Sequence, residues 1–245
     1  MAAAWRDEGL LLAVRRHGEG GALLEILTAE HGRHAGLAPG GGSRRMAPVL
    51  QPGAQLSVEW RARLEEHLGS WRVEPARSRA AAIMSDRRSL AAMGAISALL
   101  VAFLPEREPC PSLYARTLQL VDALGADPDW PALYALWELA LLGELGYGLD
   151  LFECAATGAS GPNADLAWIS PRTGRAVSRE AGGPWSDRLL PMPRLFLGDP
   201  THGEPDIALA LRATGHFLDA RVAPAFHRRA APEARARLVA LFPPS

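Results

Sequence analysis

The first eighty residues alternate short apolar runs with turn-rich segments, a pattern typical of a small β-rich domain. Apolar runs cover residues 9–16, 22–28, 32–38 and 69–73. The clearest strand spans residues 56–64, where Leu56, Val58, Trp60, Ala62 and Leu64 alternate with Ser57, Glu59, Arg61 and Arg63. No helical segment in this region is long enough for a parallel crossover. Five short strands therefore predict a small barrel or sandwich, and we expect a five-stranded OB-fold barrel, a nucleic-acid-binding architecture of this size.

The period of the apolar pattern changes after residue 77, where Ala- and Leu-rich segments replace the alternating strands. One helix is predicted over residues 87–103, with Ser85 or Asp86 as its cap and Pro105 as its stop. Further helices are predicted over residues 112–124, 129–146, 204–220 and 232–241. The sequence thus predicts an α+β protein with a barrel domain at residues 1–80 and a mostly helical domain at residues 81–245.

The stretch WPALYALWELALLGELGYGLDLFECAAT, residues 130–157, predicts the central helix of the helical domain. Between residues 133 and 147 its only charged residues are Glu138 and Glu144, so the helix needs neighbours on every side. Its apolar run is shorter than the roughly 20 residues that cross a bilayer. We expect Trp137 in the core and a cap or a buried arginine partner for each glutamate, because six residues on a helix place the two about 120° apart.

Residues 158–183 break the helical pattern. They are rich in Gly, Pro, Ser and Asn and contain one compact strand-like piece, LAWIS, followed by PRTGRAVS. This composition predicts a small hairpin appendage on the helical domain.

Composition and charge describe a folded protein and exclude several function classes. The 245 residues are 48% hydrophobic, and the formal charge is −1. No lysine occurs, so every side chain that could contact an anion here is an arginine guanidinium, which suits phosphate. The absent lysine excludes a Walker A motif, HGEGGAL lacks the third glycine of a dinucleotide-binding loop, and no GxSxG occurs. We therefore expect no enzymatic activity and no cofactor, and keep an unrecognised hydrolase only as a remote alternative.

Five arginines form a local basic segment between residues 31 and 63, against Glu59 alone: Arg33, Arg44, Arg45, Arg61 and Arg63. Such a segment suits a nucleic-acid backbone, although solvated surface charge is the alternative interpretation. His31, His34 and Trp71 could add stacking surfaces. Trp71 is more typical of a core residue, and the two histidines are more typical of a polar turn than of a metal site.

Cys110 and Cys154 stand far apart, without a CxxC partner, which predicts a reducing environment and no disulfide framework. The first residues show no signal peptide and no membrane anchor, so we expect a cytoplasmic protein.

Several separated blocks resemble one family. DEGLLLAVRRHGEG, the HGR at residues 31–33, GGGSRR followed by LQPG, WELALLGELGYGLDLFECAATG and LAWISPRTGRAVS occur in the order of the RecO family of bacterial DNA repair and recombination proteins. The resemblance covers nearly the whole chain. It implies an OB-fold domain, a helical domain, no enzymatic turnover, and binding of single- and double-stranded DNA. It also implies annealing of complementary strands and, with RecR, loading of the recombinase onto strands coated by single-strand-binding protein, in the cytoplasm at the nucleoid.

The chain departs from the family pattern in two places. Some relatives carry a four-cysteine zinc module beginning at the position of Cys154, but Thr157 stands where a CxxC partner would be, so we expect a degenerate appendage that folds without metal. The acidic, apolar tail of single-strand-binding protein needs cations beside apolar side chains, and residues 133–136 supply none. The alternative function is a scaffold for repair partners, with little DNA affinity of its own.

Overall fold

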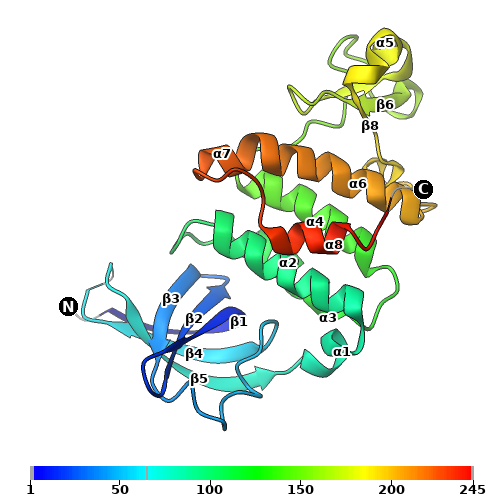
Figure 1. The fold of residues 1–245 in the computed structure, drawn as a ribbon. Helices are drawn as coiled ribbons and strands as arrows, with labels where there is room; N and C mark the ends of the chain where they lie inside the picture. Colours follow the sequence, from blue (N-terminus) through cyan, green and yellow to red (C-terminus); the bar gives the residue numbers. More distant parts are fainter. Residues whose placement is uncertain (1–2, 65, 244–245) are drawn as a thin grey trace. The chain divides into compact units, whose positions relative to one another are not determined.

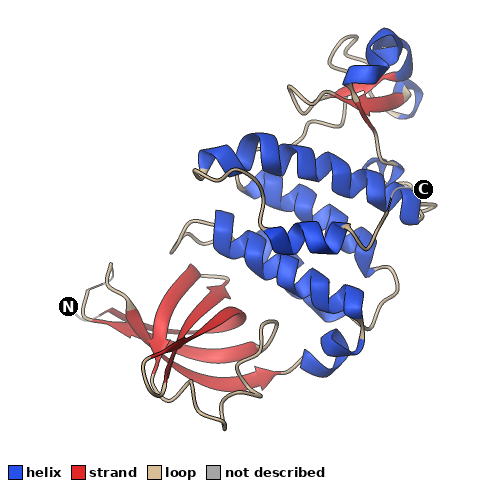
Figure 2. Ribbon diagram, in the orientation of Figure 1, coloured by secondary structure: helices blue, strands red, loops and turns tan. Residues whose placement is uncertain are grey.

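The computed structural model describes residues 3–64 and 66–243. The chain forms two compact units, residues 1–128 and residues 129–245 (Figure 1). The first unit joins the strand-rich segment to three helices, and the second holds the remaining helices with a small sheet (Figure 2). The predicted α+β class is confirmed.

The five predicted strands close into a barrel in the order β1-β2-β3-β5-β4. They are β1 (Ala3–His17), β2 (Gly21–Thr28), β3 (Gly32–Ala38), β4 (Gln55–Ala62) and β5 (Gly69–Arg77). All neighbouring pairs are antiparallel except β3 with β5, which is parallel over two residue pairs. The predicted OB-like barrel is confirmed, with β1 starting at Ala3 instead of Gly9 and β4 ending two residues early.

The barrel core uses the apolar face that the alternation in β4 predicts. Leu56, Val58 and Trp60 are almost fully buried, and Ala62 is partly buried against the same core. Trp60 lies opposite Trp5 of β1 and Trp71 of β5, so a row of three indoles crosses the barrel interior. A Cβ at Gly69 would lie 2.2 Å from the Trp60 ring, so β5 can pass this indole only with glycine there.

Three helices complete the first unit: α1 (Ala80–Ser85), α2 (Arg87–Phe103) and α3 (Pro111–Ala123). Asp86 caps α2, because its carboxylate accepts hydrogen bonds from the amides of Arg88 and Ser89. Helix α1 was not predicted, since its N-terminus at Arg79 has no capping side chain. Leu10 and Leu12 of β1 are buried, and the Tyr114 hydroxyl on α3 donates to the carbonyl of Glu8. The predicted domain boundary at residue 80 remains a prediction.

In the second unit, α4 (Trp130–Glu144) packs against α6 (Glu204–Phe217) (Figure 1). Helix α6 continues as the π-helical turn η4 (Leu218–Val222) and the short α7 (Ala223–Ala225), and α8 (Glu233–Val239) follows. The buried positions of Trp137, Leu141 and Leu142 confirm α4 as a core helix. Glu138 is fully buried and pairs with Arg235 of α8, which confirms the predicted buried arginine partner.

The appendage contains a hairpin of β6 (Leu166–Ile169) and β7 (Ala176–Ser178). A third strand, β8 (Leu190–Pro191), pairs with the other edge of β6, and the short helices η1 (Pro162–Ala164), α5 (Arg179–Gly182) and η2 (Gly183–Arg188) flank the sheet. A further short helix, η3 (Arg194–Leu197), leads back to α6. The sequence did not predict β8, because its two residues are too few for a period.

Two absences hold for the part of the chain that the structure describes. No group of three or more His, Cys, Asp or Glu side chains there could hold a metal ion, and the appendage's lack of zinc remains a prediction. No helix within residues 3–64 and 66–243 is long and apolar enough to cross a membrane.

Candidate nucleic-acid interface

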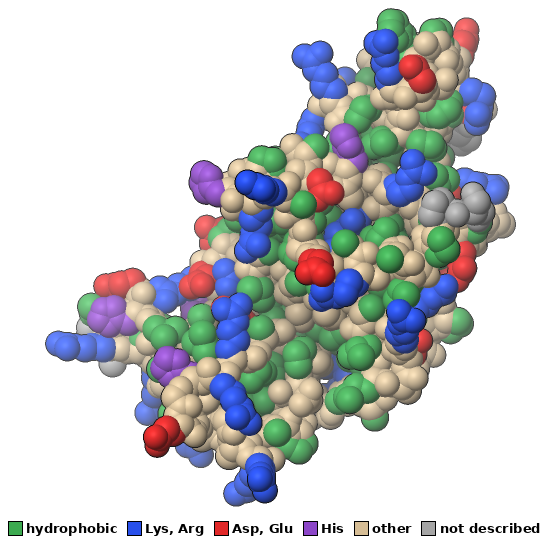
Figure 3. Space-filling model, in the orientation of Figure 1, with side chains coloured by type: hydrophobic (Ala, Val, Ile, Leu, Met, Phe, Trp, Pro, Cys, Tyr) green, Lys and Arg blue, Asp and Glu red, His purple; other side chains and the backbone are tan. Residues whose placement is uncertain are grey.

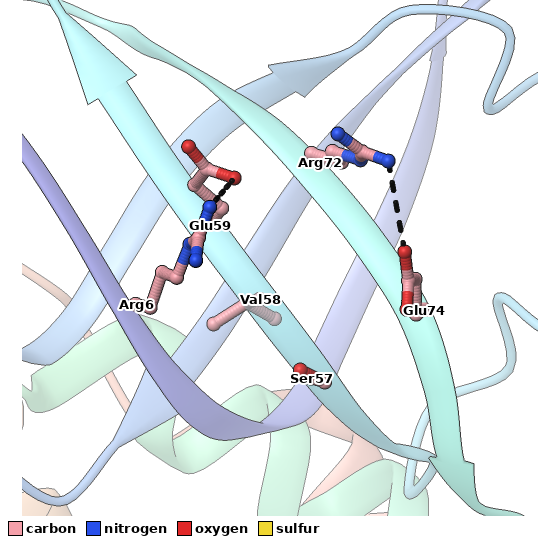
Figure 4. A pocket seen from close by; sticks show the side chains of 6 residues that line it. All are labelled: Arg6, Ser57, Val58, Glu59, Arg72 and Glu74. Carbon is pink, nitrogen blue, oxygen red and sulfur yellow. Dashed lines mark hydrogen bonds and ion pairs between the residues drawn. The ribbon is translucent and has the colours of Figure 1, made fainter.

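Charged side chains cover the outer face of β1, β4 and β5. The strand register places Arg6 opposite Glu59, and Glu59 opposite Arg72. With Ser57, Val58 and Glu74 these side chains line a surface hollow of about 280 Å³ (Figure 4). Because residues two apart on a strand share a face, Arg61 of β4 belongs to the same outer surface. This β1-β4-β5 face therefore carries Arg6, Arg61 and Arg72 together with Glu59 and Glu74.

Glu59 is the acceptor that holds this group together. Its side chain is only 12% exposed, while those of Arg6 and Arg61 are 78% and 65% exposed. Both guanidinium groups donate to its carboxylate, and the Arg6 bond measures 3.3 Å. The hydrogen bond from Arg61, with the positive charges of both arginines, lowers the pKa of Glu59. The carboxylate is thus ionised at neutral pH, in the place where a phosphate oxygen would satisfy the same donors.

The Gly-rich segment between β3 and β4 forms the exposed loop that the sequence predicts. Arg44 and Arg45 are exposed in it, and no ion pair joins either to a carboxylate within the described residues. Met46 lines a second hollow, of about 330 Å³, together with Trp71 and Arg72 of β5. The shared hollow places the Met46 end of the loop beside the strand that carries Arg72. Figure 3 shows basic side chains on the visible surface of the barrel.

The predicted strand arginines separate into two settings. Arg61 points outward from β4, as the alternation predicts, and pairs with Glu59. Arg63 lies beyond the end of β4 and is exposed in the turn leading to β5. The two are therefore not neighbours on one regular strand face, although both remain accessible.

Arg33 does not belong to this surface. It is 8% exposed, and its guanidinium donates to Glu25 of β2 at 2.7 Å and to Glu106 at 3.4 Å. It also donates twice to the carbonyl of Leu104. These bonds satisfy the side chain and fasten the segment after α2 to β3. We correct the predicted site accordingly and draw the interface without Arg33.

Two family descriptions match nearly the whole chain. Recombination protein O N terminal matches residues 1–79, and Recombination protein O C terminal matches residues 84–230. The chain is 54% identical over 235 residues to DNA repair protein RecO of Ruegeria sp. (strain TM1040), covering 96% of each chain. It is 53% identical over 238 residues to DNA repair protein RecO of Cereibacter sphaeroides (strain ATCC 17029), covering 97% of this chain and 98% of the relative. The chain belongs to the RecO family.

Arg6 and Arg72 of this RecO-family chain were missed by sequence reasoning. Residues 3–8 are AAWRDE and contain too few apolar positions to predict a strand, so β1 was predicted to begin after Arg6. Arg72 stands between Trp71 and Val73, and that alternation was a usable signal once the fifth strand had been placed. The sequence alone does not determine the register of the strands, which places Arg6 on one side of Glu59 and Arg72 on the other.

The three proposed stacking residues gather at the barrel's row of indoles, but two are inaccessible. Trp71 is 2% exposed and His34 is 4% exposed, so Trp71 is a core residue as expected. His31 stacks on Trp5 with ring centroids 3.9 Å apart and bonds to Asp7 at 3.3 Å. Of the three, only His31, with a side chain 27% exposed, could offer a ring to a base.

The buried His34 predicts a loss of stability in acid. Burial, assisted by the positive charge of Arg107, lowers its pKa from 6.5 to about 4. At pH values between about 4 and 6.5, the unfolded chain binds a proton at His34 that the folded chain does not bind. The free energy of unfolding therefore falls as pH drops from about 6.5 to 4, by up to about 3 kcal/mol. Denaturant titrations across this range should show the loss. His34→Gln should flatten it, and an equally steep acid limb in that variant would contradict the assignment.

The geometry around Glu59 predicts that this residue restrains DNA binding. Glu59→Gln removes the carboxylate that competes with phosphate for Arg6 and Arg61, so affinity for a single-stranded oligonucleotide should rise by about two- to fivefold at low salt, with a steeper salt slope. Fluorescence anisotropy measures both quantities. Glu144→Gln is the matched control, because it changes net charge equally and Glu144 is exposed on α4, outside the β1-β4-β5 face. If the two variants raised DNA affinity equally, the change in net charge would explain the effect, and Glu59 would have no specific role in DNA binding.

Proposed function

We propose that this chain is a non-catalytic DNA-binding recombination mediator. It binds and anneals single strands, binds double strands as well, and with RecR helps to load the recombinase onto strands coated by single-strand-binding protein, at the nucleoid. The observation that carries the proposal is the set of exposed arginines on the barrel, Arg44, Arg45 and Arg63 in loops and Arg6, Arg61 and Arg72 on strands. Membership of a family of DNA repair proteins supports the same function.

The arrangement suits backbone tracking better than base reading. Guanidinium groups on long, exposed side chains can follow phosphates of any sequence, whereas most of the barrel's aromatic rings are turned into its core. Neutralising phosphates also reduces the repulsion between two strands that must approach each other to pair. A sequence-tolerant surface of this kind is what strand annealing requires.

Strand annealing by the full chain tests the proposal. Two complementary oligonucleotides, one carrying a donor dye and the other an acceptor, are mixed either bare or coated with single-strand-binding protein. The chain should accelerate pairing in both conditions, and Arg44→Ala with Arg45→Ala should reduce the acceleration. Arg237→Ala is a matched control, because that exposed arginine on α8 already pairs with Glu233.

The scaffold alternative predicts a different outcome. A protein that only gathers repair partners would leave the pairing of bare strands at its spontaneous rate and act only when single-strand-binding protein is present. That result would overturn the proposed DNA-binding role of the barrel.

A further inference from the structure

The second compact unit carries its own group of arginines where α6 ends. Arg221 lies in the π-helical turn η4, and Arg228 and Arg229 are exposed just after α7. Arg172 is exposed in the turn between β6 and β7. Within the described residues none of these four arginines forms an ion pair with a carboxylate. We call Arg172, Arg221, Arg228 and Arg229 the η4 cluster.

Specific contacts bring the η4 cluster together. The Arg221 guanidinium lies 5.5 Å from the ring centroid of Phe217 and donates a hydrogen bond to the carbonyl of Arg172. These contacts hold the hairpin turn against the end of α6. The Arg228 amide donates to the carbonyl of Ala223 at 2.8 Å, which folds the tandem arginines back onto α7. Arginines from three chain segments therefore lie around the end of the continuous helix formed by α6, η4 and α7.

The backbone here is unusual in two ways. A π-helical turn is rare and is frequently found at functional sites, and here it carries Arg221. His227, the residue before the tandem arginines, has φ of 55°, a left-handed conformation that side chains other than glycine seldom adopt. Figure 3 shows basic and histidine side chains at this end of α6, where Figure 1 places α7.

The neighbouring acids do not neutralise the cluster. Asp219 of η4 accepts a hydrogen bond from the amide of Ala231, and Glu233 is paired with Arg237. Of these two acids, Asp219 is the one without an arginine partner in the described part of the chain. Uncompensated guanidinium groups at such density are typical of a surface that binds phosphates, and in a family of DNA repair proteins the matching polyanion is a DNA strand.

We propose that the η4 cluster is a second DNA-binding surface, which holds one strand while the barrel holds another. The inference rests on the proposed annealing function and deepens it, because annealing requires two strands on one protein. Each surface lies within a single compact unit, so the inference needs no particular arrangement of the two units.

A two-strand capture experiment with the full chain tests this. The chain is bound to an immobilised single-stranded oligonucleotide, and a labelled, non-complementary oligonucleotide is then added at several salt concentrations. Arg228→Ala with Arg229→Ala should lower capture of the second strand severalfold and flatten its salt slope by up to about 1.4. Binding to the first strand should remain. Arg229→Gln alone should give about half of the change in slope, and Arg237→Ala should give none.

The possible results distinguish failure of the second DNA-binding surface from failure of the proposed annealing function. Unchanged second-strand capture in the Arg228/Arg229 variant, with first-strand binding weakened by Arg44→Ala and Arg45→Ala, would overturn the second surface alone. No binding of any strand by the unaltered chain would overturn both. Reduced capture together with lower salt dependence in both Arg229 variants, at unchanged melting temperature, supports the second surface.

Discussion

Arg235→Ala should lower the free energy of unfolding by about 3–5 kcal/mol, because it leaves a carboxylate buried without its counterion. Glu138 is fully buried, and Arg235 donates to its two oxygens at 2.7 and 2.8 Å. Tyr134 and Thr214 donate to the same carboxylate at 2.8 and 2.5 Å. Burial alone would disfavour the charge on Arg235, but attraction to Glu138 outweighs it and raises the pKa of the arginine.

A double-mutant cycle distinguishes this account from simple loss of packing. The cycle compares Arg235→Met, Glu138→Leu and their combination, which removes both charges while keeping most of the volume, so the double variant should be more stable than Arg235→Met alone. Denaturant unfolding followed by circular dichroism measures the differences. A loss below about 1 kcal/mol in Arg235→Ala would mean that water reaches the carboxylate, contrary to its burial.

Trp137→Ala should cost about 3–5 kcal/mol through the cavity it leaves in α4. The indole is 2% exposed and lies 5.7 Å from the ring of Tyr134. Leu133 and Leu141 lie one turn away on either side, on a helix with almost no polar face. The loss should appear as a lower melting temperature, with DNA affinity retained at temperatures where the variant is folded.

Trp185→Ala is the control for that substitution. Trp185 is 55% exposed in the appendage, with the Arg188 guanidinium 5.6 Å from its ring centroid, so its replacement should change stability by about 1 kcal/mol or less. If Trp137→Ala kept its melting temperature and lost DNA binding, Trp137 would be a binding residue and not a core residue.

Local patterns predicted much of the fold, because they depend on neighbours in sequence. The alternation in residues 56–64 identified the buried face of β4, and of the two predicted caps of α2, Ser85 or Asp86, Asp86 is the observed one. Partners distant in sequence were beyond such patterns. The apolar surroundings of Glu138 showed that it needed a cation, but Arg235 lies 97 residues further along the chain and only the packing of α4 with α8 selects it.

The candidate site followed the same rule. The exposure of Arg44 and Arg45 was predictable because a Gly-rich loop is exposed wherever it lies. The burial of Arg33 was not, because it depends on contacts such as that with Glu106, 73 residues away. Arginines of the same basic segment therefore differ in role: Arg44 and Arg45 are surface charges, and Arg33 is a buried side chain that joins two segments of the chain. Net charge along a segment identifies candidates, and only tertiary contacts decide among them.

The most direct test of the account is the salt dependence of single-strand binding by the full chain and its Arg44→Ala, Arg45→Ala variant. Each phosphate contact releases counterions, so log K should fall with log salt by about 0.7 per contact. The double variant should bind every sequence more weakly and show a slope flatter by up to about 1.4, with stability within about 0.5 kcal/mol per site. An unchanged slope would remove the loop from the DNA interface, and a loss confined to particular sequences would contradict backbone tracking.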